Sequence, residues 1–484
     1  MKLLLKNHSE RYAVEQLQLQ LFPDTPSEFV TGEFEGDGAR SALFRGRTFL
    51  TARTQITWHG KTASAQRRVR LSQADVRQTR RILQQSYYLA AVQLLPNRPP
   101  WGALSGVRPS KLSTKCLQEG GTSAQARRLM EQVYYVTPER AKLCVEASEA
   151  TLAAAELLEE RDLSVYIGIP FCPTRCAYCS FVSESIERCG SLLPAYLQCL
   201  EKEIRYTGAL LAASGYHIRT LYIGGGTPTT LSAPQLTELL ACVRDSFDLS
   251  RCLEFTVEGG RPDTLDAQKL RAIRQGGAAR ISINPQTMSD AVLRAVGRRH
   301  TAAQTAEAFG LAREAGFDDI NMDLIAGLPG DTPASFASSL SQVLELGPSN
   351  VTVHTLALKK SAALFQKRAG LPAQEAVAQM LRDAEPALRG AGFSPYYLYR
   401  QKYMSGSFEN TGWRREGYVG LYNIYMMEEL HTILSLGGGG MNKLELPGQR
   451  LERWHNPKFP QDYIDRIDTI LRQKDEIFAL LQKR

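Results

Sequence analysis

The chain lacks the marks of an exported or membrane-spanning protein. No apolar run approaches the roughly 20 residues that a helix needs to cross a bilayer. Residues 1–9 contain neither the apolar core nor the cleavage site of a signal peptide. Internal repeats and low-complexity tracts are also missing. We therefore expect a cytoplasmic globular protein without a membrane span.

The chain also lacks a large excess of positive or negative charge. The 58 Lys and Arg residues are nearly balanced by 50 Asp and Glu residues, which leaves a net charge of +8 over 484 residues. So small an excess is typical of an ordinary mixed surface. The densest basic stretch, Arg67–Arg70 followed by Arg77, Arg80 and Arg81, is most simply the solvated edge of a strand and a helix. The excess could favour an anionic small molecule or a nucleic acid, but an ordinary mixed surface explains it better, so the charge does not favour a nucleic-acid partner.

Residues 1–160 predict an α+β amino-terminal domain, whose role the sequence does not reveal. Alternating runs predict short strands, and apolar residues at helical spacing predict helices. The expected strands are Val30–Glu35, Ser41–Arg45, Phe49–Trp58 and Arg67–Leu71, and the expected helices are Asp75–Leu95 and Pro138–Glu159. No catalytic constellation is visible in this part of the sequence.

Residues 161–360 alternate between short apolar runs and helical stretches, mostly at the roughly 30-residue interval of a βαβ unit. The expected strands are Val165–Ile169, Thr220–Ile223, Leu253–Val257, Ala279–Ile283, Ile320–Ile325 and Val351–Leu356. The expected helices are Leu192–Ala213, Ala233–Ser246, Leu265–Gln275, Asp290–Ala315 and Pro333–Leu346. This alternation predicts a parallel α/β sheet, an incomplete (β/α)6 barrel with ligands at the carboxyl ends of its strands.

Residues 361–484 predict a mainly helical carboxyl-terminal domain, with helices at Glu375–Arg389 and Asp462–Gln482. Between them lies a polar and aromatic segment, Tyr396–Tyr425, which is a candidate cover for the substrate. Its Arg400 and Lys402 could pair with carboxylates, because a guanidinium fork suits a carboxylate. The alternative is a solvated loop packed on the barrel mouth.

Cys172, Cys176 and Cys179 give the strongest chemical signal, a Cys-x3-Cys-x2-Cys spacing directly after the first barrel strand. Thiolates are the usual ligands of iron–sulfur clusters, and three close cysteines would leave one iron of a 4Fe–4S cluster open. A structural zinc site is the rival, but zinc sites close with four ligands. The next candidates, Cys189 and His217, lie farther along the chain. The other cysteines are most simply small buried hydrophobes.

The string Ile169-Pro-Phe-Cys-Pro-Thr-Arg-Cys-Ala-Tyr-Cys-Ser180 resembles the signature of the radical S-adenosylmethionine (SAM) superfamily. Tyr166-Ile-Gly-Ile-Pro-Phe-Cys172 is similar to the oxygen-independent coproporphyrinogen III oxidase family, and the likeness continues through Gly224–Thr229 and Asn321–Pro329. At full length the chain resembles the HemZ-type coproporphyrinogen dehydrogenase branch, which the strings Trp101–Pro109 and Tyr399–Lys402, with Glu409 and Asn410, support.

The resemblance implies a 4Fe–4S cluster on the three cysteines, SAM at that cluster and, in the family, a second SAM. The family contacts to the cluster-bound SAM carry over to Tyr166, Gly225 and Glu258. Those to the second SAM carry over to Tyr178, Gly226, Thr227, Gln286, Arg298, Asp323 and Ala357. Glycines let a backbone approach a ligand closely, although a tight turn would explain them too. A buried Asp323 needs a partner, for which Arg298 is the natural candidate.

The resemblance further implies an oxidoreductase of porphyrin and haem biosynthesis that converts two propionates of coproporphyrinogen III to vinyl groups without oxygen. Its partners would be a tetrapyrrole substrate and an electron donor such as a flavodoxin or ferredoxin. Two features depart from the family pattern. Gly168 stands where the family usually has His, and Thr256–Asp263 replaces the common Glu-x-Asn/Asp-Pro pattern.

Two rival functions remain. A haem chaperone could use the same barrel, but its His-Asn-x-x-Tyr-Trp signature is matched only by Tyr422–Met427, which lacks the His, the Tyr and the Trp. His354 and His431 would be its candidate haem ligands, although a lone His is more often structural. The other rival is a radical SAM enzyme that acts on a different substrate, such as RNA.

Overall fold

The computed structural model describes residues 1–483 apart from 24, 180–183, 359–361, 363, 368–369, 402–407, 447 and 449. Ser180 and Lys402, both named above, lie outside the described residues. The chain divides into two compact units, one of Met1–Val145 with Arg400, Gln401 and Phe408, the other of Glu146–Tyr399 and Glu409–Arg484. These boundaries differ from the expected ones: the first falls after residue 145, and the residues after 360 largely join the barrel unit.

The first unit is a five-stranded sheet in the order β2-β1-β3-β4-β5 with helices packed against it. Its strands are β1 (Lys2–Lys6), β2 (Glu28–Val30), β3 (Gly38–Arg45), β4 (Phe49–Trp58) and β5 (Lys61–Arg70), and its helices include α1 (Arg11–Leu21), α2 (Val76–Ala91), α3 (Ser110–Gln118) and α4 (Ser123–Arg128). Along β4, Ala52, Thr54 and Ile56 are buried and alternate with more exposed residues. Thr54 Oγ1 lies 2.9 Å from Ser86 Oγ of α2, so this face of the sheet packs on α2.

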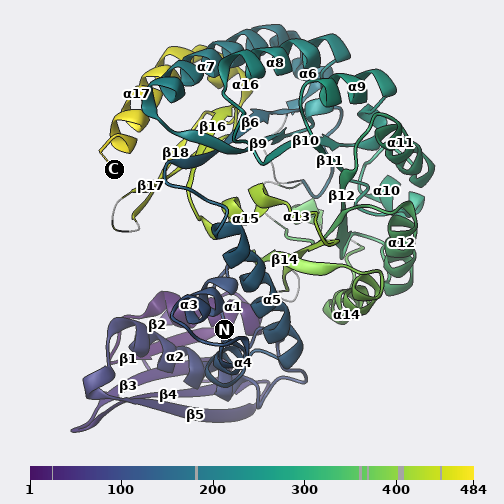
Figure 1. Cartoon of the computed structure of the whole chain (residues 1–484). Coiled ribbons are helices and arrows are strands. Elements are labelled where there is room, and N and C mark those ends of the chain that lie inside the picture. Colours follow the sequence, from purple (N-terminus) through teal and green to yellow (C-terminus); the bar gives the residue numbers. More distant parts are fainter. Residues whose placement is uncertain are drawn as a thin grey trace. The chain divides into compact units, whose positions relative to one another are not determined.

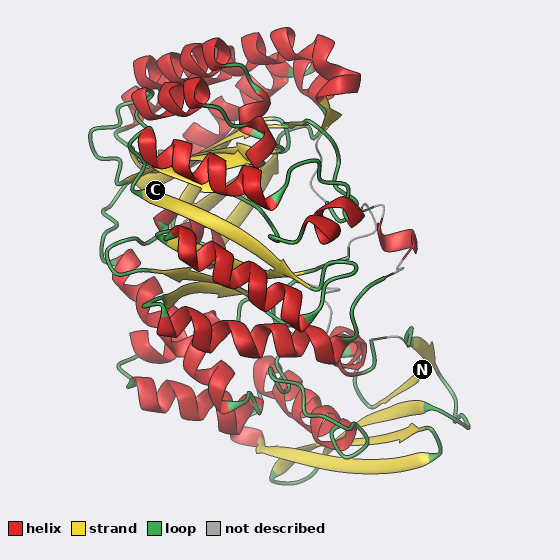
Figure 2. Cartoon of the chain, turned by 90° about the vertical axis from the view of Figure 1, so that its right-hand side faces the viewer, coloured by secondary structure: helices red, strands yellow, loops and turns green. Residues whose placement is uncertain are grey.

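The second unit is built on an eleven-stranded sheet in the order β14-β15-β13-β12-β11-β10-β9-β6-β16-β17-β18, among the residues described. The central strands are β6 (Asp162–Ile169), β9 (His217–Gly225), β10 (Glu254–Gly260), β11 (Arg280–Ile283), β12 (Asp319–Ala326) and β13 (Asn350–Thr355). They are parallel neighbours in sequence order, which confirms the incomplete six-unit barrel. Helices follow the outer side of these strands (Figures 1 and 2).

Four of the six barrel helices begin at a residue whose side chain caps the first turn. The six are α7 (Leu193–Ser214), α8 (Ala233–Ser246), α9 (Ala267–Gln275), α10 (Asp290–Ala295), α11 (Ala302–Glu314) and α12 (Pro333–Leu346), and α5 (Pro138–Ala155) precedes them. Ser232 and Thr301 form capping boxes at α8 and α11, which satisfies two otherwise unpaired N–H groups at each end. The single helix expected over 290–315 is two helices, separated where Gly297 takes a φ of +78°. Within the described residues, no helix is both long and apolar enough to cross a membrane.

The carboxyl-terminal part combines the expected helices with strands that we did not predict. The helices are α14 (Gln374–Gly390), α15 (Leu421–Glu428), α16 (Pro460–Asp465) and α17 (Ile467–Leu481), and the strands are β14 (Ser394–Tyr399), β15 (Asn410–Arg414), β16 (Thr432–Gly437), β17 (Met441–Leu446) and β18 (Arg450–His455). β14 and β15 extend one end of the sheet, and β16–β18 extend the other.

β16 lies beside β6, the strand that leads into the cysteine loop. The two strands pair in parallel from Thr432 opposite Leu163 to Gly437 opposite Gly168. A Cβ atom at Gly168 would lie 2.6 Å from the carbonyl oxygen of Gly438. No side chain fits there without moving the backbone, which explains in physical terms why this chain has Gly where the family usually has His.

Candidate active site

The three cysteines lie on the loop that follows β6 at the carboxyl end of the barrel strands. Cys172 ends the short strand β7 (Phe171–Cys172), which pairs with β8 (Glu184–Ser185). The backbone N–H of Cys179 donates to the carbonyl of Cys176 at 3.0 Å, which closes a tight turn between them. All nine cysteines of the chain are thiols rather than disulfides. The loop therefore offers three thiols in eight residues.

The glycine loop after β9 is packed directly on the cysteine loop. The N–H of Gly226 donates to the carbonyl of Ile169 (2.8 Å), and the N–H of Thr227 donates to that of Phe171 (2.7 Å). Cys172 Sγ lies 3.4 Å from Thr227 Oγ1. A Cβ at Gly226 would fall 2.5 Å from the carbonyl oxygen of Phe171 and 3.0 Å from Cys172 Sγ. The glycine loop therefore packs closely on the cysteine loop, and its contact with SAM stays a prediction.

Arg261 fastens the cysteine loop to the end of β10. Its guanidinium donates to Thr174 Oγ1 at 2.5 Å and makes a bidentate pair with Asp263, at 2.9 and 2.6 Å. The arginine is 2% exposed, so both interactions are shielded from water. Arg261 belongs to the segment Thr256–Asp263, which departs from the family pattern. Its position directly after a barrel strand is the signal that could have marked Arg261 as a positioning residue.

Three stacked tyrosines form an apolar floor inside the barrel. The ring of Tyr422 on α15 lies 4.6 Å from that of Tyr222, and both stack near Tyr166. Glu254, at the start of β10, accepts from the backbone N–H groups of Leu421 and Tyr422 and so anchors α15. Part of the segment expected to cover the substrate therefore closes the barrel from below.

Glu258 lies on β10 two residues beyond Thr256, which is level with Tyr222, and so lies on the carboxyl-terminal side of the three tyrosines. In the neighbouring strands its level is occupied by Gly224 and Gly168, and a Cβ at Gly224 would lie 2.8 Å from Glu258 Oε2. Burial, and then the nearby charge of Asp323, raise the pKa of Glu258 to about 8. An N–H from Gly225 and the charge of Arg298 oppose this shift without cancelling it. The lumen at this level therefore favours a cation.

Asp323 is paired with His354 rather than with Arg298, so the predicted partner was wrong. His354 Nε2 lies 3.6 Å from Asp323 Oδ2, and Asn321 Nδ2 donates to Asp323 Oδ1 at 2.8 Å. Burial works to raise the pKa of Asp323, but the hydrogen bonds and charge of His354, with further hydrogen bonds, leave it below its ordinary value. Asp323 therefore remains an anion on the lumen side of β12.

Arg298 instead points toward the cysteine loop. Its guanidinium donates to the carbonyl of Asn284 at 2.5 Å. Burial lowers the pKa of Arg298, but the charges and hydrogen bonds of Tyr178 and Cys176 outweigh burial and raise it. The arginine thus joins the cysteine loop to the strand end of β11, which is a position the sequence could not reveal.

Gln286 lies beside Asp323 through its backbone. Its N–H donates to the carbonyl of Asp323, and its own carbonyl accepts from Ile325, both at 2.9 Å. Its φ of +69° is unusual for a residue other than glycine, and its buried Oε1 has no hydrogen-bond partner in the described part of the chain. A buried polar atom without a partner is costly unless a ligand supplies one. The predicted contact Ala357 follows β13 at this same end of the barrel.

A chain of hydrogen bonds runs across the lumen between these groups. Asn284 Nδ2 donates to Glu258 Oε1 at 3.4 Å, and Ser282 Oγ donates to Asn284 Oδ1 at 2.6 Å. Asn321 Nδ2 continues the chain, because it donates both to Ser282 Oγ (2.9 Å) and to Asp323. The two carboxylates are therefore held in fixed positions on either side of the polar network.

The donor chemistry of these residues fits a cluster and SAM. Three thiols in one loop suit an iron–sulfur cluster, although in the described residues no three Cys, His, Asp or Glu side chains are arranged around one metal position. SAM carries a sulfonium and an ammonium group, and the inner side of the barrel offers them two carboxyl groups, of which Glu258 has a pKa raised by burial and by the nearby charge of Asp323. Cys172, Cys176 and Cys179 would hold the cluster.

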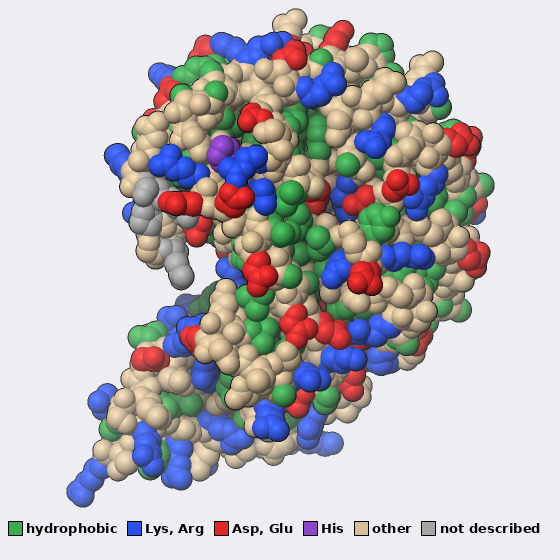
Figure 3. Space-filling model, in the orientation of Figure 1, with side chains coloured by type: hydrophobic (Ala, Val, Ile, Leu, Met, Phe, Trp, Pro, Cys, Tyr) green, Lys and Arg blue, Asp and Glu red, His purple; other side chains and the backbone are tan. Residues whose placement is uncertain are grey.

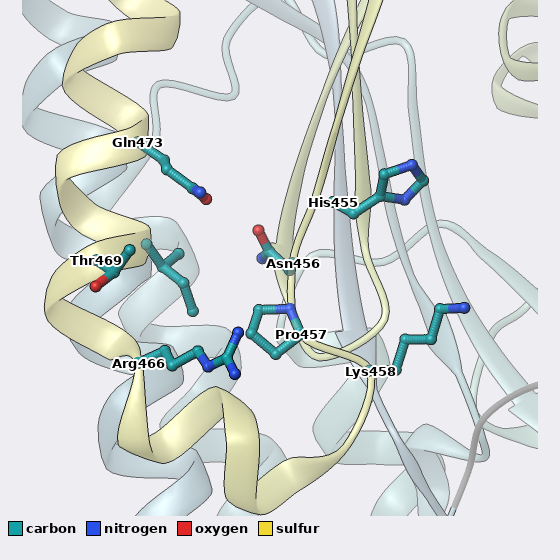
Figure 4. A pocket seen from close by; sticks show the side chains of 8 residues that line it. His455, Asn456, Pro457, Lys458, Arg466, Thr469 and Gln473 are labelled. Carbon is teal, nitrogen blue, oxygen red and sulfur yellow. The ribbon is translucent and has the colours of Figure 1, made fainter.

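A cavity of about 210 Å³ lies elsewhere, between the end of β18 and α17, and contains none of the predicted residues. Figure 4 shows Arg466 and Gln473 directed toward the gap, whereas His455 and Lys458 project from the far side of their chain segment.

Arg400, proposed above as a carboxylate partner, is 6% exposed and donates to the carbonyl of Leu104 at 2.6 Å. The structure therefore argues against Arg400 as a ligand contact.

Comparison with known proteins gives a consistent result. Residues 166–343 match the Radical SAM superfamily model. The chain is 38% identical over 394 residues, 79% of each chain, to the oxygen-independent coproporphyrinogen-III oxidase-like protein HemZ of Bacillus subtilis (strain 168). It is 35% identical over 268 residues, 53% of this chain and 68% of the relative, to the heme chaperone HemW of the same organism.

A solved structure agrees with this placement. The coproporphyrinogen III oxidase HemN of Escherichia coli aligns with a TM-score of 0.54 at 25% identity, over 67% of this chain and 73% of that one. The barrel and its cysteine loop define a member of the radical SAM superfamily. Within that superfamily, the chain belongs to the family of HemZ-like and HemN-like proteins, and its cofactors are a 4Fe–4S cluster and SAM.

Proposed function

We propose that this protein catalyses the oxygen-independent oxidative decarboxylation of coproporphyrinogen III, converting propionates to vinyl groups. The observation that carries the proposal is the set of polar side chains on the inner side of the barrel strands. It includes two fixed carboxylates, Glu258 and Asp323, and an unpartnered buried amide oxygen on Gln286 beyond the cysteine loop. A site that must hold SAM and a substrate side chain together needs such a set of polar groups. The likeness over most of the chain to HemZ, an oxygen-independent coproporphyrinogen-III oxidase-like protein, supports the same choice.

The bound cluster and SAM supply hydrogen-atom abstraction from an unreactive carbon, and the chain supplies position and shelter. Glu258 and Asp323 attract the positive groups of SAM in a site of low polarity, where charge interactions are strong. Tyr166, Tyr222 and Tyr422 exclude water from below. Arg261 and Gly226 keep the cysteine loop against the barrel, so that the reacting groups meet in one orientation.

The second candidate is a haem chaperone, which the 35% identity to HemW favours. Of its two candidate haem ligands, His431 is 4% exposed, and its Nε2 lies 2.7 Å from Ser164 Oγ. Its ring also packs against Tyr425. His354 is a quarter exposed but lies beside Asp323. These contacts support the oxidase, because neither imidazole is presented openly to a haem.

The deciding experiment is product analysis after anaerobic incubation of the reconstituted protein with SAM, a reductant and coproporphyrinogen III. We expect products lighter by one and two carboxyl groups, formed together with 5′-deoxyadenosine. The variant Asp323→Asn should lose this product while keeping its iron. Stoichiometric haem binding that disappears in His354→Ala, without decarboxylation under any reductant, would instead make the protein a haem carrier.

A further inference from the structure

The positive charge of the chain is concentrated in three strands of the first unit. Residues 38–70, which comprise β3, β4, β5 and the turns between them, contain eight Lys and Arg residues and no Asp or Glu. This equals the net charge of +8 of the entire chain, so the remaining residues balance. The eight are Arg40, Arg45, Arg47, Arg53, Lys61, Arg67, Arg68 and Arg70. The net positive charge is therefore localised in this segment and is not spread over the whole chain, as the overall composition suggests.

Several of these cations share the face of the sheet that turns away from α2. Ala52, Thr54 and Ile56 of β4 face α2, so the residues between them point to the opposite side. Arg53 is one of these. In the neighbouring strand Arg68 pairs across from Thr51, and Arg70 pairs across from Phe49, which places both arginines on the same open face.

This open face combines exposed arginines with aromatic rings. Arg53, Arg68 and Arg70 are exposed, and none of them forms an ion pair with a carboxylate in the part of the chain that the structure describes. Phe44, opposite Thr51 on β3, is 49% exposed, and the guanidinium of Arg68 lies 4.5 Å above the ring of Phe49. Figure 3 shows Lys and Arg side chains, with few acidic ones, along the edge of this unit where β5 runs in Figure 1.

We propose that this open face, carried by Phe44, Phe49, Arg53, Arg68 and Arg70, binds a single strand of nucleic acid. Phosphates complement the unpaired arginines, and bases stack on exposed aromatic and guanidinium planes without sequence preference. β4 and β5 have ten residues each, so the face is roughly 33 Å long, enough for several nucleotides. An anionic membrane would use the arginines but would have no need of flat rings placed between them. This proposal is independent of the reaction in the barrel.

The test is binding of the full-length protein to a fluorescent, unstructured 20-nucleotide RNA, followed by anisotropy across a salt series. The triple variant R53A/R68A/R70A should bind on the order of tenfold or more weakly, and its slope of log affinity against log salt should be shallower by about 2, at ~0.7 per lost phosphate contact. Phe44→Ala should weaken binding between about fivefold and 100-fold without changing that slope, because it removes stacking rather than charge.

The matched control R205A/R271A/R382A removes the same charge from exposed helix positions of the second unit and should bind like the wild type. Unchanged circular dichroism and Tm in each variant show that the sheet is intact. Equal affinity of the two triple variants, or no RNA binding at 50 mM salt, would overturn the proposal. So would arginine-dependent binding to vesicles containing phosphatidylglycerol that RNA does not displace, which would make the face a membrane contact.

Discussion

Replacing Glu258 by Gln should stabilise the cofactor-free protein while weakening its affinity for SAM. Glu258 has an ordinary pKa of 4.5 that the folded barrel raises to about 8, mainly by burial. At ~1.36 kcal/mol per pKa unit, this difference sets an upper limit of roughly 5 kcal/mol on the cost of ionising Glu258 in the folded state. Glu258 is only partly buried, and charges in real protein sites are screened more than in a dry interior, so we expect about 1–3 kcal/mol of stabilisation at pH 8 and above.

The pH dependence follows from the direction of the shift. A carboxyl whose pKa is raised by folding binds more protons in the folded state, so its contribution favours folding at low pH and is lost as pH rises. The wild type should therefore lose stability relative to Glu258→Gln between about pH 4.5 and pH 8. Above that range the difference should stay constant. Differential scanning calorimetry of the cluster-free protein measures it directly.

SAM binding gives the same titration a second readout. If the positive groups of SAM lie beside Glu258, binding must ionise the carboxyl, and at pH 7 the wild type should release close to one proton per SAM. Titration calorimetry in buffers of different ionisation enthalpy counts that proton. Glu258→Gln should release none and bind at least about tenfold more weakly. The exposed substitution Glu314→Gln on α11 serves as the control. A Tm difference independent of pH, together with SAM binding that releases no proton, would refute this reasoning.

Three further predictions concern the cysteine loop. Cys176→Ala should lower reconstituted iron from about four per chain to nearly none, whereas Cys199→Ala should retain it; full iron in the first variant would exclude the proposed ligand set. Gly226→Ala should slow 5′-deoxyadenosine release about tenfold or more, because its Cβ meets the neighbouring backbone, while Gly310→Ala, with open space around it, should not; equal rates would show that the loop can shift freely. Arg261→Lys should destabilise the protein by about 1–3 kcal/mol, which lowers its Tm, and should speed the loss of iron on dilution. An unchanged Tm and rate of iron loss would mean that the contacts of Arg261 with Thr174 and Asp263 are dispensable.

The barrel could be predicted from sequence because its strands are buried on both faces and recur at the spacing of βαβ units. The Ser232 capping box is a further local signal, because it marks in the sequence where α8 begins. The strands β14–β18 escaped prediction because they are defined by their neighbours. β16 is a short apolar run ending in glycine, and only its partner β6 makes it a strand. β18 is largely exposed and alternates weakly, so its pattern does not distinguish a strand from a loop.

The cysteine site was visible in the sequence because its three ligands are close together along the chain. The partners of Asp323 were not, since they come from other elements. Arg298 looked suitable by charge, but the α10–α11 connection directs it to Asn284 and the cysteine loop. His354 lies on the adjacent strand, where parallel register places it within reach of Asp323. Opposite charges indicate which residues could pair, and the register of the strands determines which of them lie within reach of each other.

The pairing of β16 with β6 has a consequence for biosynthesis. Ser164 of β6 and His431, which lie side by side at the base of these strands, are 267 residues apart in the chain. During translation β6 therefore emerges long before the neighbour that covers its edge, and until then it remains an open edge of the kind that invites aggregation. The cysteine loop is attached to that same strand. Iron insertion should then follow release of the nearly complete chain, and a ribosome-stalled chain ending before residue 432 should accept a cluster poorly.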